Sequence, residues 1–87
     1  MNTYEYNFSV VCPNDKESIQ FNLSITTAET IFVEDIKTFL EGHKEAFQED
    51  LANKLHAKFG GRQVIKAIHQ DVLITTCRGS DKSIVYY

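Results

Sequence analysis

The sequence has few cysteines and no long hydrophobic run, and each shortage excludes a class of protein. Two cysteines in 87 residues, Cys12 and Cys77, do not supply the framework of a disulfide-stapled secreted domain. No apolar run approaches the ~18 residues that a membrane-spanning helix needs. The first five residues lack the basic and apolar stretches that begin a secretory signal. We therefore expect a cytoplasmic protein with two reduced thiols, and a Cys12–Cys77 bridge only if their strands are neighbours.

The histidines and glycines form no recognised catalytic or metal-binding motif. His43, His56 and His69 are thirteen residues apart, so no two of them lie one helical turn from each other. A cysteine nucleophile would need a histidine from a distant segment. The glycine pair before Arg62 follows a helix-forming run, whose C-terminal dipole repels anions, and it lacks the Lys-Ser/Thr of a phosphate-binding loop. The sequence accordingly predicts a non-enzymatic protein without a metal or a cofactor.

A β-hairpin is the clearest local signal. Residues 4–10 and 19–25 each alternate between apolar and polar side chains, the period of a half-buried strand. The segment between them, 12–17, contains Pro, Asn and Asp, which favour turns. If Val10 faces Ile19, every later inward pair is also apolar: Phe8 with Phe21, Tyr6 with Leu23, and Tyr4 with Ile25. A slip of one residue would destroy this match, so the register is well specified.

Two helices are expected after the hairpin. Thr26 and Glu29 have the spacing of a capping box, which predicts a helix start at Thr26. The β-branched stretch that follows indicates extended chain, so the helix is firmly predicted only for 33–41, and Gly42 is the expected end. The second helix is indicated by Phe47, Leu51, Leu55 and Phe59, four residues apart, and by the glycine pair that ends it.

The remaining residues return to β-strand character. Two apolar runs, 64–68 and 72–74, are separated by a polar turn at 69–71, and 83–87 is a possible further strand or a docked tail. The order is therefore β-β-α-α-β-β, with a possible last β. We expect a single α+β domain spanning 1–87, an antiparallel four- to five-stranded sheet with two helices packed on one face.

Charge is distributed unevenly along the chain. Residues 29–50 contain seven acidic and two basic residues, whereas 51–87 contain six basic and two acidic residues. The six acidic residues expected to bind a partner are Glu34, Asp35, Glu41, Glu45, Glu49 and Asp50. A secondary basic surface is expected at Lys58, Arg62, Lys66 and Arg78. Part of this contrast reflects acidic and basic residues placed favourably for the dipole of the second helix. The functional hypothesis therefore depends on the excess of acidic residues around 34–49.

The favoured hypothesis is a non-enzymatic protein-interaction module. Its acidic helical region would dock on a basic surface of another protein, in the manner of a small acidic inhibitor that occupies the nucleic-acid site of a nucleic-acid-handling protein. The first alternative is a homo-oligomeric structural domain whose edge strand, at 84–87, pairs with a second copy. Another is a small nucleic-acid binder that uses the basic C-terminal half. The sequence pI of about 5.5 disfavours direct nucleic-acid binding.

Overall fold

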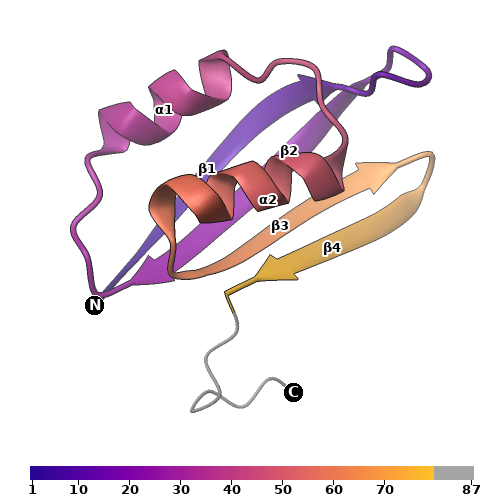
Figure 1. Cartoon of the computed structure of the whole chain (residues 1–87). Coiled ribbons are helices and arrows are strands. Elements are labelled where there is room, and N and C mark those ends of the chain that lie inside the picture. Colours follow the sequence, from indigo (N-terminus) through magenta and orange to yellow (C-terminus); the bar gives the residue numbers. More distant parts are fainter. Residues whose placement is uncertain (80–87) are drawn as a thin grey trace.

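Four antiparallel strands form one sheet, and two helices lie on one of its faces (Figure 1). The computed structural model describes residues 1–79. The elements, in chain order, are β1 (Asn2–Val11), β2 (Ser18–Thr27), α1 (Val33–Glu41), α2 (Gln48–Phe59), β3 (Arg62–His69) and β4 (Val72–Arg78). The strand order across the sheet is β1-β2-β3-β4, so each strand pairs with its neighbour in sequence. The α+β class and the β-β-α-α-β-β order are confirmed, while the possible fifth strand at 83–87 lies outside the described residues.

The β1–β2 hairpin has the predicted register. Val10 pairs with Ile19, Phe8 with Phe21, Tyr6 with Leu23 and Tyr4 with Ile25. On the opposite face, polar side chains bond across the two strands: Asn22 Nδ2 donates to Asn7 Oδ1 at 2.8 Å, and Gln20 Nε2 donates to Ser9 Oγ at 2.6 Å. One face of the hairpin therefore contributes to the core, and the other presents amides and hydroxyls away from the helices.

The capping-box prediction for the first helix is wrong. Thr26 and Thr27 belong to β2, where Thr26 pairs with Thr3 on one side and with Arg62 on the other. Pairing on both sides satisfies more backbone groups than a helix start would, so the sheet retains these residues. Thr27 Oγ1 accepts the Glu29 backbone N–H at 3.0 Å in a local turn, and the N-cap Phe32 has an extended backbone before α1 begins at Val33. The predicted segment 33–41 is confirmed.

The second helix matches its predicted pattern. Leu51 and Leu55 are fully buried, and Phe59 packs edge-on against Phe39 of α1, with 5.8 Å between ring centroids. Phe47 precedes the helix as its N-cap and is half exposed. At the other end Gly60 has φ 65° and ψ −155°, a backbone conformation that is essentially restricted to glycine.

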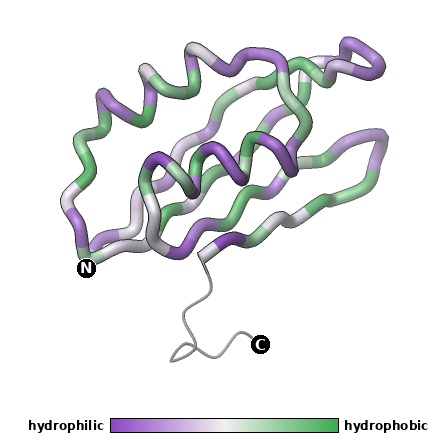
Figure 2. Tube along the Cα trace, in the orientation of Figure 1, coloured by the Kyte–Doolittle hydropathy of each residue, from purple (hydrophilic) through white to green (hydrophobic). Residues whose placement is uncertain are grey.

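The β3–β4 hairpin turns at the predicted polar residues. Gln70 and Asp71 both have positive φ, 50° and 70°, as a two-residue type I′ loop requires. On β3, Gln63, Ile65 and Ala67 are buried toward the helices. β4 is an outer strand, and its hydrophobic part is the end next to the turn (Figure 2).

A single hydrophobic core joins the sheet to both helices. It contains residues of β1, β2, β3, α1 and α2, together with Cys12 of the β1–β2 turn: Val10, Cys12, Ile19, Phe21, Leu23, Ile25, Ile36, Leu40, Leu51, Ala52, Leu55, Ile65 and Ala67. Only Ile36 and Leu40 of α1 are buried, so most of the surface of that helix is exposed. Within residues 1–79, neither helix has the length and apolar character needed to cross a membrane.

Candidate functional site

The six predicted acidic residues are all exposed, and they are distributed along the helical side of the molecule. Glu34 and Asp35 lie in the first turn of α1, and Glu41 is its last residue. Glu45 lies in the connection between the helices, while Glu49 and Asp50 lie in the first turn of α2. Both helices thus place carboxylates at their N-termini, where the helix dipole stabilises negative charge.

Two of these carboxylates are neutralised within the molecule. Glu45 accepts the Lys16 ammonium at 2.8 Å, and Glu49 accepts Arg78 Nη2 at 3.1 Å. Arg78 also donates through Nε to Asn53 Oδ1 at 2.8 Å, so it joins β4 to α2. These two acidic groups hold segments of the fold together, and a basic partner would have to compete with their present contacts.

Of the four remaining acidic groups, Asp50 lies in the first turn of α2, and the other three lie on α1. Among residues 1–79, no ion pair involves Glu34, Asp35 or Glu41. Glu34 and Glu41 are seven residues apart, so both lie on the side of α1 that faces away from the buried Ile36 and Leu40. Just before them in the chain, Phe32 and Val33 are 67% and 55% exposed. We call Phe32, Val33, Glu34, Asp35 and Glu41 the α1 acidic surface.

The four predicted basic residues do not gather on one face. Lys58 is in the last turn of α2, and Arg78 contacts α2 from β4. Lys66 alternates with the buried Ile65 and Ala67, so its side chain lies on the sheet face opposite to the helices. Arg62 is half buried at the start of β3. This scatter gives no continuous track of positive charge of the kind that follows a nucleic-acid backbone.

A second exposed feature is the tip of the β3–β4 hairpin. Ile68 is 64% exposed, Val72 59% and Leu73 61%, and Ile74 is also exposed. Ile68 pairs with Leu73 on the face opposite to the helices, whereas Val72 and Ile74 lie on the helix side. We call these four residues the β3–β4 tip. Among residues 1–79 no strand pairs with the outer edge of β4, and this edge is next to an apolar surface.

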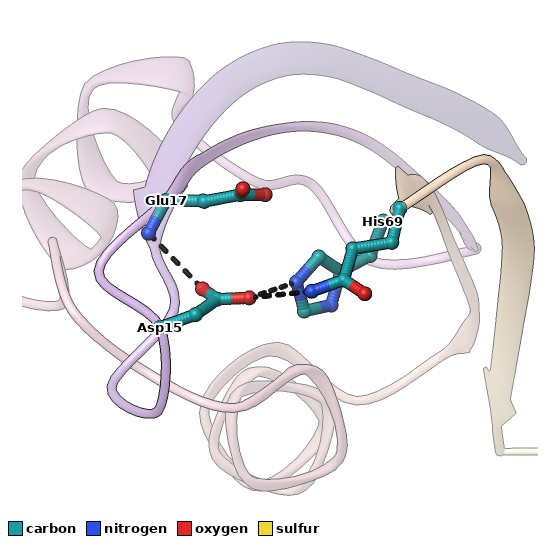
Figure 3. Close-up of polar contacts among 4 residues, drawn as sticks. Asp15, Glu17 and His69 are labelled. Carbon is teal, nitrogen blue, oxygen red and sulfur yellow. Dashed lines mark hydrogen bonds and ion pairs between the residues drawn. The ribbon is translucent and has the colours of Figure 1, made fainter.

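The third feature joins the β1–β2 turn to the β3–β4 turn (Figure 3). Asp15 Oδ2 accepts hydrogen bonds from His69 Nε2 at 2.8 Å and from Gln70 Nε2 at 3.0 Å. Its other oxygen, Oδ1, accepts the Glu17 backbone N–H at 3.1 Å. The Cys12 thiol lies in the same group, because the potential ligand atoms of Cys12, Asp15 and His69 are all within 4.8 Å of one another.

These contacts perturb the Asp15 carboxyl. The pKa of Asp15 is lowered to about 2. The largest cause is the hydrogen bond from the Glu17 backbone N–H, and the next is the hydrogen bond with His69. Donors that bond to the carboxylate stabilise its charged form relative to the protonated acid. Asp15 is therefore a fixed negative charge between the two turns over the physiological pH range.

Sequence reasoning missed this group of side chains. It excluded a cysteine–histidine site because the residues are far apart along the chain, and it considered the histidines as partners for one another. The available signal was the strand order: in an antiparallel β1-β2-β3 arrangement, the end of β1 and the end of β3 reach the same edge of the sheet. Cys12 and Cys77 are both free cysteines in the structure.

Comparisons with known proteins assign no family to the chain. No protein-family model matches the sequence, and no curated protein and no solved structure shows significant similarity to it.

Proposed function

We propose that the chain is a cytoplasmic, non-enzymatic protein-interaction module whose α1 acidic surface docks on a basic surface of another protein. One observation carries the proposal: Glu34, Asp35 and Glu41 stay exposed and without an ion pair among the described residues, on a helix whose start also exposes two apolar side chains. An apolar centre with charged neighbours is the usual composition of a specific protein interface. The charges would steer the encounter, and Phe32 and Val33 would supply the buried contact area.

The class of partner follows from charge complementarity. Carboxylates on a helix can occupy arginine and lysine sites that otherwise bind phosphate groups. We therefore propose that the partner is a nucleic-acid-handling protein and that the chain acts as a small acidic inhibitor of it. In this proposal Glu45 and Glu49 have a secondary role, because Lys16 and Arg78 already neutralise them.

The test compares two variants that change the net charge equally. Glu34→Lys/Glu41→Lys alters the α1 acidic surface, and Glu5→Lys/Glu17→Lys alters exposed positions on β1 and in the β1–β2 turn. Partners are first captured from native lysate at low and high salt and identified by mass spectrometry, and the affinity of each purified partner is then measured by calorimetry. We expect the α1 variant to lose at least about tenfold in affinity and part of its salt dependence, while the control binds like the wild type.

Equal affinity of the two variants would contradict the proposal, provided that circular dichroism shows both to be folded. A competition experiment then tests the inhibitor role. A partner that binds nucleic acid should release it when the wild-type chain is added, and retain it when the α1 variant is added.

The β3–β4 tip favours a second candidate function, self-association through β4. The outer strand β4, whose exposed Val72 and Leu73 lie next to Ile68 of β3, can pair with the same strand of a second copy around a twofold axis, which extends the sheet and covers the apolar side chains. Light scattering over a range of concentrations should then show a dimer, and Leu73→Lys should shift the mass toward the monomer. A monomeric wild type at high concentration would exclude this candidate.

A further inference from the structure

Two turns that are far apart in sequence meet at one edge of the sheet. β1 and β3 run in the same direction because β2 is antiparallel to both, so each of them ends at this edge. Cys12 and Asp15 follow β1, and His69 is the last residue of β3. Within residues 1–79, they form a group of three side chains whose thiol, carboxylate and imidazole ligand atoms all lie within 4.8 Å of one another.

The β1–β2 turn holds Cys12 and Asp15 in a fixed arrangement. The Cys12 backbone N–H donates to Glu17 O at 2.9 Å, and the Lys16 N–H donates to Cys12 O at 2.8 Å. Lys16 adopts a positive φ of 63°, which closes the loop. Because Asp15 also accepts the Glu17 N–H, the orientation of its carboxylate does not depend on its contact with His69. Two of the three potential ligands are therefore positioned by the backbone of one tight turn.

We propose that Cys12, Asp15 and His69 bind a divalent transition metal of the zinc class, with the fourth tetrahedral position open to solvent. Thiolate, imidazole and carboxylate are the ligands that zinc prefers in proteins. Tetrahedral zinc at its usual bond lengths separates such ligand atoms by about 3.4 to 3.6 Å. The three ligand atoms now lie within 4.8 Å of one another, so side-chain movements of about 1 Å would complete the site. The His69 and Asp15 side chains are 24% and 23% exposed, which leaves a route for the ion.

Metal binding changes the proton positions in a defined way. The Cys12 thiol loses its proton to solvent and binds as the thiolate. His69 binds through Nε2, and the proton of its neutral ring is then carried on Nδ1. The present hydrogen bond between His69 Nε2 and Asp15 Oδ2 is replaced by one bond from each atom to the metal. Loading therefore releases one proton per ion when His69 begins neutral, and affinity rises with pH.

Neighbouring groups support a cation at this position. Gln70 Nε2 and the Glu17 N–H would continue to orient the Asp15 carboxylate, the role that second-shell donors have in known metal sites. Lys16 is the basic residue of the turn, and its ammonium is directed onto Glu45 at 2.8 Å, which reduces its repulsion of the ion. The site is distinct from the α1 acidic surface, so the metal proposal goes beyond the proposed function and does not depend on it.

The experiment titrates the reduced full-length chain with Co²⁺ and then with Zn²⁺. We expect a thiolate-to-cobalt charge-transfer absorption that saturates at one ion per chain, its loss when Zn²⁺ displaces Co²⁺, and a rise in Tm with Zn²⁺. Cys12→Ser should abolish the absorption, and Asp15→Asn and His69→Gln should each weaken Co²⁺ binding by at least about tenfold. The matched controls Cys77→Ser and His43→Gln should bind like the wild type.

Asp15→Asn keeps the proposal testable if the buried Cys12 does not tolerate substitution, because Asp15 lies outside the hydrophobic core. Absence of the charge-transfer band in the wild type would overturn the proposal. So would a band that Cys77→Ser removes and Cys12→Ser retains, or an affinity that Asp15→Asn and His69→Gln both leave unchanged.

Discussion

Gly61 is the residue at which adding a single methyl group, by substitution with alanine, should be most informative about the stability of the fold. It lies between α2 and β3 and has φ 71°, in the left-handed region. A Cβ atom added there would lie 2.8 Å from the Thr26 carbonyl oxygen and 2.9 Å from Thr27 Cβ. Both of these atoms belong to the end of β2, which is held by hydrogen bonds to neighbouring strands. The strand cannot move away without weakening its pairing.

The cost of Gly61→Ala can be worked out from these two effects. An alanine in the left-handed region costs about 1 to 2 kcal/mol, and overpacking against a rigid neighbour costs about 1 to 3 kcal/mol. Alanine restricts the unfolded chain more than glycine does, which offsets about 0.4 to 1 kcal/mol of this. We expect a net loss of about 1 to 5 kcal/mol in the free energy of unfolding, out of the roughly 4 to 13 kcal/mol typical of a chain of this length.

Gly42→Ala is the matched control. Gly42 has φ −80°, a conformation open to any residue, and its added Cβ would meet only the Phe39 carbonyl oxygen at 3.5 Å. Urea unfolding should show Gly42→Ala within about 0.5 kcal/mol of the wild type or slightly more stable. Thermal unfolding should show Gly61→Ala with a Tm lower by about 4 to 40 °C. Equal stabilities of the two variants would refute the reasoning.

Three further predictions concern the core, a loop anchor and a titrating group. Leu55→Ala should lower the free energy of unfolding, measured in urea, by about 2 to 5 kcal/mol, because Leu55 is fully buried in α2. Lys54→Ala, at the exposed neighbouring position, should change that free energy little. Tyr4→Phe removes the hydroxyl that accepts the Ile31 N–H at 3.1 Å, so amide exchange at Ile31 should quicken while global stability falls by only about 0.5 to 1.5 kcal/mol. The Asp15 pKa of about 2 lies below its unfolded value, so its stabilisation is present above about pH 4 and is lost as the pH falls through about 2. With a chelator present, the stability difference between wild type and Asp15→Asn should therefore narrow on acidification, and a difference independent of pH would contradict this assignment.

The sequence was informative wherever one physical preference dominated. The register of β1 and β2 follows from alternation alone, because only one alignment places Phe8 opposite Phe21 and leaves Asn7 opposite Asn22. The polar turn at 69–71 was predictable for a similar reason, since it separates two strongly apolar runs. In both segments, local propensity and burial favour the same structure.

The start of α1 was mispredicted because two preferences competed. Thr26 and Glu29 have the spacing of a helix cap, but Thr26 also fits between β1 and β3, and that position depends on strands that are distant in sequence. The site at Asp15 has the same character. His69 and Cys12 become neighbours only through the strand order, which no local pattern specifies. Alternation cannot reveal which turns share an edge of the sheet.

The sequential strand order has a consequence for how the chain folds. The β1–β2 and β3–β4 pairings are local hairpins, and a hairpin closes in about 1 to 10 μs. The β2–β3 pairing is different, because it must close the chain over residues 28–61, which contain both helices. Closing that loop costs entropy before Leu23 and Ile65 gain their contacts, so this single pairing is expected to dominate the folding barrier. The centre of the sheet is therefore the slowest part to assemble, while each outer strand joins a partner that is already close to it in sequence.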